Sequence, residues 1–193
     1  MDEVLLDPSH FDREFLMLEI LVENPGRINF GEINGQRMGL SKSPCVNGMK
    51  IESKWNIISL PFSEEEILQL DYSWNESSLP VALPAFFSAS LEIPGKPADT
   101  FIEMEGWGKG VIFVNGRNLG RYWVSAGPQK TLYLPGCWLK SGQNKIVWFE
   151  EEQIGSKLFF RNEPDLGERD CGDDVLVSTG PSTTYAKIYY GIK

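Results

Sequence analysis

The sequence has one histidine and three cysteines among 193 residues, so it is poor in the side chains that most often catalyse or bind metal. A Ser-His-Asp or Cys-His triad would have to use His10, near a terminus, and no Gly-x-Ser-x-Gly elbow is present. Cys45, Cys137 and Cys171 include no Cys-x-x-Cys spacing. We therefore expect no metal site and no cofactor. At most one disulfide is available, and the sequence leaves its partners open.

Positive charge and long apolar runs are also scarce. The chain has 18 Lys and Arg against 27 Asp and Glu, for a formal net charge of −9. That charge repels the phosphate backbone of nucleic acids and the surface of anionic membranes. No apolar run approaches the roughly 20 residues of a membrane span, and residues 1–7 are acidic where a signal peptide would be basic. We expect no nucleic-acid partner, no membrane span and no signal peptide in this chain.

Short apolar runs separated by turn residues dominate what is present, and their length is typical of strands. The runs are Phe15–Val22, Trp55–Leu60, Phe86–Ile93, Val111–Val114, Lys130–Leu134 and Lys145–Phe149. Pro25-Gly26 suits a type II turn, and Asn115-Gly116 suits the type I′ turn of a tight hairpin. The pattern predicts an all-β fold, an antiparallel jelly-roll sandwich arranged in two β units of which the first is incomplete.

One helix is expected, because Ser63 and Glu66 have the spacing of a capping box at the start of a short apolar run. The Ser- and Pro-rich stretch after it indicates a linker. We predict a partial first β domain with a connector helix over 1–72, a linker over 73–84, a β-sandwich over 85–167 and a divergent tail over 168–193.

Groups that resemble catalytic or ligand-binding motifs have simpler explanations. Gly106–Gly110 has the look of a phosphate loop, but a strand follows it and the lysine is not followed by Ser or Thr. Asp170–Asp174 lacks the spacing of a calcium loop, so we interpret it, like Glu150–Glu152 at a strand end, as solvated acid. No pair of carboxylates facing a cleft is evident, so no catalytic residue is assigned. Asn75 begins a sequon for N-glycosylation.

Aromatic side chains crowd the second β unit, and two interpretations of them stay open. Exposed rings stack on sugars while amide and guanidinium groups bond the hydroxyls, which makes a carbohydrate site of Trp107, Asn115, Asn118, Arg121, Tyr122 and Trp123. We favour packing instead, since alternate strand positions fill a core. Trp148 and Phe113 should then point inward, with at most two of Trp107, Tyr122 and Trp123 exposed.

Two long motifs carry a family resemblance. The stretches 18–31 and 108–123 resemble, in order and spacing, signatures of the β region of glycoside hydrolase family 35 β-galactosidases. Residues 127–135, Trp138-Leu139 and 144–150 continue the second motif, and the similarity extends from about Phe15 to Gly167. The segment after Glu168 has no counterpart in that family, and strands that open its first β domain are expected to be missing.

The resemblance implies galactose-binding-like domains that follow a (β/α)₈ barrel whose two glutamates cleave terminal β-galactosyl residues with retention. Such a barrel needs about 250 residues, more than this chain has. The leading interpretation is a non-catalytic portion that scaffolds this barrel, its expected partner, in a lysosomal or extracellular enzyme. The alternatives are a free-standing lectin-like module that binds galactosides and an enzyme of unknown type.

Overall fold

The computed structural model describes residues 19–24, 31, 39–40, 42–46, 48–51, 54–70, 83–167, 184–185 and 187–190. Several features noted in the sequence lie outside these residues: His10, the Pro25-Gly26 turn, the Asn75 sequon, Asp170–Asp174 and Cys171. The chain forms two compact units, Met1–Ser59 and Leu60–Lys193.

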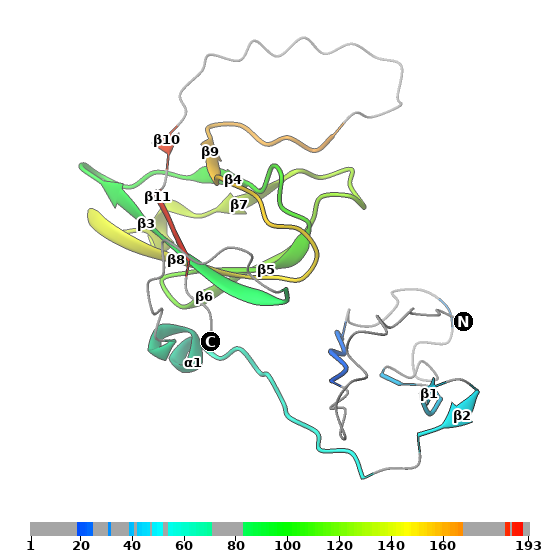
Figure 1. The fold of residues 1–193 in the computed structure, drawn as a ribbon. Coiled ribbons are helices and arrows are strands. Elements are labelled where there is room, and N and C mark those ends of the chain that lie inside the picture. Colours follow the sequence, from blue (N-terminus) through cyan, green and yellow to red (C-terminus); the bar gives the residue numbers. More distant parts are fainter. Residues whose placement is uncertain are drawn as a thin grey trace, which may run out of the picture. The chain divides into compact units, whose positions relative to one another are not determined.

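The second unit is a sandwich of two antiparallel sheets (Figure 1). The five-stranded sheet has the order β11 (Lys187–Tyr190), β3 (Ala85–Ile93), β8 (Gly142–Glu150), β5 (Lys109–Val114), β6 (Arg117–Trp123). The four-stranded sheet has the order β10 (Thr184–Tyr185), β9 (Phe159–Arg161), β4 (Thr100–Glu103), β7 (Thr131–Leu134). Every pairing is antiparallel, so the predicted all-β sandwich is confirmed.

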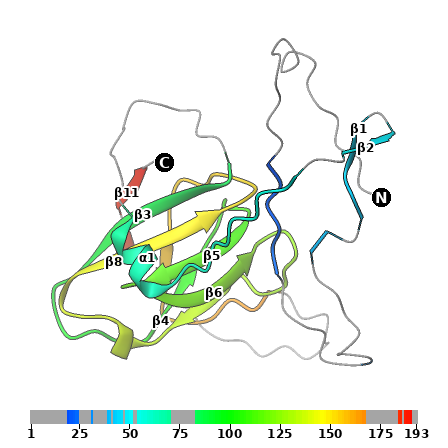
Figure 2. The same ribbon diagram turned by 90° about the horizontal axis from the view of Figure 1, so that it is seen from below.

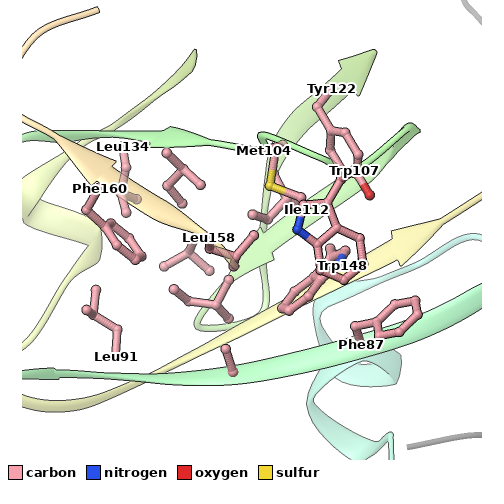
Figure 3. Close-up of a cluster of buried hydrophobic side chains, with 14 of the residues drawn as sticks. Phe87, Leu91, Met104, Trp107, Ile112, Tyr122, Leu134, Trp148, Leu158 and Phe160 are labelled. Carbon is pink, nitrogen blue, oxygen red and sulfur yellow. The ribbon is translucent and has the colours of Figure 1, made fainter. Parts of the chain in front are cut away.

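The core lies between the inner faces of these two sheets. Because successive strand residues point to opposite faces, alternate apolar residues of each strand meet there. Figure 3 labels Phe87, Leu91, Ile112, Tyr122, Leu134, Trp148 and Phe160 from the strands, and Met104, Trp107 and Leu158 from the segments between strands. The ring of Trp107 packs edge-on against Trp148 with centroids 5.0 Å apart, and Phe87 stacks on Trp148 at 5.7 Å.

The predicted hairpin joins β5 to β6. Asn115 and Gly116 have φ angles of 51° and 85°, as a type I′ turn requires. Glycine is needed at the second position for a further reason, since a Cβ on Gly116 would lie 2.8 Å from the Glu64 side chain. The hairpin prediction is confirmed, and its tip touches the helix.

The predicted helix, α1 (Glu64–Gln69), begins at Ser63 with both hydrogen bonds of a capping box, as its sequence indicated. It lies against the outer face of the five-stranded sheet (Figure 2), where Ile67 packs with Phe113 and Val147. Phe62 joins this second cluster. The sequence grouped the helix with residues 1–72, whereas the structure places it in the unit that contains the sandwich.

The first unit has one described hairpin, β1 (Cys45–Val46) with β2 (Met49–Lys50). The strand predicted over Trp55–Leu60 is wrong, because these residues pair with no other strand, and Ile57 is 94% exposed. The described part of Phe15–Val22 is also outside any strand. Strand propensity makes a ladder only where a neighbouring strand supplies the hydrogen bonds, and the described residues supply none here.

The segment after Gly167 contributes strands that the sequence did not predict. Its backbone forms β10, which pairs with β9, and β11, which pairs with β3. A short 3₁₀ turn, η3 (Gly136–Trp138), follows β7. Among the described residues, no helix is long and apolar enough to cross a membrane.

Candidate functional site

Two of the six predicted carbohydrate-binding residues are inside the sandwich. Trp107 is buried and its indole N–H donates to the Lys157 carbonyl at 2.8 Å. Tyr122 is also buried and points into the core (Figure 3). Trp148 and Phe113 are fully buried, and Trp123 is exposed. Most of these rings are therefore buried, as predicted, but Phe113 points away from the main core and is covered by α1, so its predicted inward orientation is wrong.

The side chain of Asn115 is used in hydrogen bonds that stabilise the fold. Its amide nitrogen donates to the Trp138 carbonyl and to Asn144 Oδ1, both at 2.9 Å. Its amide oxygen accepts from the Lys145 N–H at 3.0 Å. These bonds tie the β5–β6 hairpin to the start of β8, where Asn144 is itself buried.

The other three predicted residues share one surface. Asn118, Arg121 and Trp123 lie on β6 opposite Phe113, Val111 and Lys109 of β5, so all three project from the outer face of the five-stranded sheet. Trp123 is 41% exposed, with Lys109 Nζ 4.7 Å and Arg121 Cζ 5.6 Å from its ring centroid.

We call Lys109, Asn118, Arg121 and Trp123 the β6 surface. Lys109 also pairs with Glu151 at 3.4 Å. Cation–π contacts of this kind hold the indole in place. Two cations therefore already lie over the ring that a sugar would use for stacking.

A buried carboxylate lies beneath this surface, which corrects the interpretation of Glu150 as solvated acid. Glu150 has no exposed surface. Five groups donate to it: the backbone N–H groups of Gly108, Lys109, Glu152 and Gln153, and the Tyr122 hydroxyl, at 2.8 to 3.2 Å. Burying a carboxylate is tolerated only with such satisfaction.

The surroundings of Glu150 leave little room around its oxygens. A Cβ on Gly110 would lie against the Phe149 carbonyl and 2.7 Å from the Tyr122 hydroxyl, so this position requires glycine. Burial, together with the charge of Glu150, raises the pKa of Tyr122, which keeps its hydroxyl a donor. The cluster thus joins β5, β6 and β8 at one end of the sheet.

The carboxylate of Glu150 is not available for the chemistry of a glycosidase. A glycosidase needs one carboxyl group to protonate the leaving oxygen and a second about 5 Å away to attack the sugar. The oxygens of Glu150 already accept from five donors and contact no solvent.

The described residues also contain no group of three or more His, Cys, Asp or Glu suited to a metal. Cys45 and Cys137 are exposed free thiols.

The structure also gathers residues that the sequence did not single out. Five of the side chains on the outer face of the four-stranded sheet form what we call the aromatic face: Phe101, Glu103, Tyr133, Phe159 and Arg161. Their signal was weak because they come from three separate strands, of which β4 and β9 were not predicted.

Contacts within the aromatic face hold it together. Phe101 and Tyr133 have ring centroids 5.5 Å apart, and Arg161 bonds Glu103 at 2.6 Å. At its edge, Asp99 accepts from the Gly136 N–H at 2.7 Å and the Tyr133 hydroxyl at 2.9 Å. These two bonds, the first above all, lower the pKa of Asp99.

With the fold established, comparison with known proteins assigns both units. Residues 9–61 match the first all-β domain of β-galactosidases, and residues 84–144 match the β-galactosidase galactose-binding domain. The sandwich thus belongs to the class of galactose-binding β domains. The chain belongs to the β-galactosidase family and carries these two β domains of it.

Similar proteins come from distant organisms. The human Beta-galactosidase-1-like protein 2 is 46% identical over 155 residues, which are 79% of this chain and 24% of that protein. Beta-galactosidase 1 of Dictyostelium discoideum is 36% identical over 158 residues, 76% of this chain and 22% of that protein. The chain thus spans about a quarter of the length of the relatives it matches.

Proposed function

We propose that this chain is the non-catalytic β portion of a glycoside hydrolase family 35 enzyme and scaffolds a catalytic barrel that lies outside it. The observation that carries the proposal is the presence of matches to two β domains of β-galactosidases, in sequence order. The parent reaction would be retaining hydrolysis of terminal β-galactosyl residues. By resemblance, the enzyme would be lysosomal or extracellular, where the Asn75 sequon could be glycosylated.

The carboxylates of the sandwich support this assignment. Glu150 is enclosed by its donors, and Glu103 is committed to Arg161 across β4 and β9. Both therefore contribute to the fold rather than to an open reaction site. In this proposal hydrolysis requires the barrel, and the β domains hold it in shape.

The chain alone should not hydrolyse a β-galactoside, because that reaction needs an acid and a nucleophile facing one sugar, and the buried or paired carboxylates Glu150 and Glu103 of the described residues do not supply them. The purified chain is assayed with a chromogenic β-galactoside at acidic and neutral pH, beside variants Glu103→Gln, Glu105→Gln and Glu150→Gln. We expect only the uncatalysed rate. Turnover that disappears in one of the three variants would show a new active site and reject the non-catalytic proposal.

A second candidate function is a lectin-like module, favoured by the exposed Trp123 within the domain matched as galactose-binding. Sugar stacking needs an open aromatic face, and Lys109 and Arg121 lie over this one. We therefore expect calorimetric titration with galactose to give no saturable heat at millimolar concentration. Saturation that is lost in Trp123→Ala, but kept in the control Tyr133→Ala on the other sheet, would favour the lectin.

A further inference from the structure

The outer faces of the two sheets differ in how far their apolar side chains are covered. On the five-stranded sheet, α1 and Phe62 cover the centre, so that Phe113 and Val147 are buried although they point away from the main core. This sheet therefore has apolar partners on both sides. The chain itself supplies the covering element.

The four-stranded sheet keeps its outer aromatic side chains in contact with solvent. Tyr133 is 50% exposed, and Phe101 and Phe159 are half-buried. Within the described part of the chain no helix covers them, since α1 lies on the other sheet. Leu166, in the loop after β9, is a further exposed apolar residue of this unit.

The chemistry of the aromatic face fits a protein surface better than a sugar. The rings of Phe101 and Tyr133 are inclined by 52°, so they do not form one flat platform for a pyranose. Arg161 is paired with Glu103 and lies 5.3 Å from the Phe159 ring, which leaves the charge of the face balanced. Tyrosine, phenylalanine and arginine are enriched at protein interfaces, and four of the five residues of the aromatic face are of these types.

We propose that the aromatic face docks the catalytic barrel, which deepens the proposed function and rests on it. About three quarters of each relative lies outside the region that this chain matches, so in proteins of this family a large body of chain is present to cover an apolar face. The other sheet offers it mainly the β6 surface, which has a single ring, Trp123, with two cations over it. The aromatic face offers three rings, Phe101, Tyr133 and Phe159, and is therefore the larger apolar surface to cover.

The experiment co-expresses the full chain with the human Beta-galactosidase-1-like protein 2 from which the matched region has been deleted. Co-purification tests the proposed function. Hydroxyl-radical footprinting of the isolated chain and of the complex then tests the docking face. Tyr133 and Trp123 are a matched pair, being 50% and 41% exposed on opposite sheets. We expect Tyr133 to lose its reactivity in the complex while Trp123 keeps it.

Variants give an independent measurement. Tyr133→Asp should weaken co-purification about tenfold or more, as charge at a central interface tyrosine does, and Trp123→Asp should leave it unchanged. Protection of Trp123 alone, or of neither residue in a complex that does form, overturns the docking face but keeps the scaffold. Failure of the two proteins to co-purify overturns both proposals.

Discussion

Replacing Glu150 by alanine is expected to lower the free energy of unfolding by about 3–5 kcal/mol, the cost of breaking a buried charged network. The carboxylate has no exposed surface and accepts from five donors. Alanine would leave those donors around a small cavity without an acceptor. Urea unfolding followed by tryptophan fluorescence measures the loss, since Trp148 is the residue two before it in β8.

Two further variants make the Glu150 result specific. Glu150→Gln keeps the shape but replaces one acceptor oxygen by an NH₂ group that faces donors, so a loss of about 2 kcal/mol is expected. Glu152→Gln removes a neighbouring charge whose side chain is exposed, and should change stability by no more than about 0.5 kcal/mol. If Glu150→Ala cost no more than Glu152→Gln, the cluster would not support the fold.

Local patterns were sufficient where the structure is locally determined. The Asn115-Gly116 turn and the capping box at Ser63 each depend on residues within four positions of one another, and both were predicted correctly. The strands β3, β5, β7 and β8 also followed from apolar runs. Because these strands are buried on one or both faces, their apolar residues form runs that can be recognised in the sequence.

Glu150 could not be placed in this way. It stands beside Glu151 and Glu152, and a run of three acids is usually solvated. What buries it comes from far along the chain, since the bonds from Gly108 and Tyr122 span 42 and 28 residues. Local sequence patterns carry no signal for hydrogen-bond donors that only the topology of the sheet brings to Glu150.

The predicted carbohydrate site was dispersed for a related reason. Residues 121–123 are consecutive on β6, and consecutive strand residues face opposite sides of a sheet. Tyr122 therefore enters the core while Arg121 and Trp123 face outward. The aromatic face was missed because its residues come from three short strands, which only the antiparallel register of β9, β4 and β7 brings together.

Removing the Phe62 ring should detach α1 from the sandwich. The ring centroid of Phe62 lies 5.3 Å from that of Phe86, 6.1 Å from that of Phe113 and 5.2 Å from that of Phe149. A helix of six residues is too short to be stable alone, so it depends on this packing. We expect Phe62→Ala to destabilise the unit by about 3 kcal/mol. Hydrogen exchange should show the amides of Ile67 and Leu70, which bond Ser63 and Glu66, losing protection.

The backbone conformation of Phe62 supplies a second test of whether its ring holds α1 on the sheet. Its φ of 51° is left-handed, a conformation that costs a non-glycine residue about 1 kcal/mol. Phe62→Gly removes the ring and also that strain, and the relief offsets the greater freedom of glycine in the unfolded chain, so Phe62→Gly should be no more destabilising than Phe62→Ala. Gln69→Ala, at an exposed helix position, is the control and should keep the amides protected. Equal protection of these amides in Phe62→Ala and Gln69→Ala would show that the aromatic contacts of Phe62 do not hold the helix, because losing contacts that hold it must expose its amides to exchange.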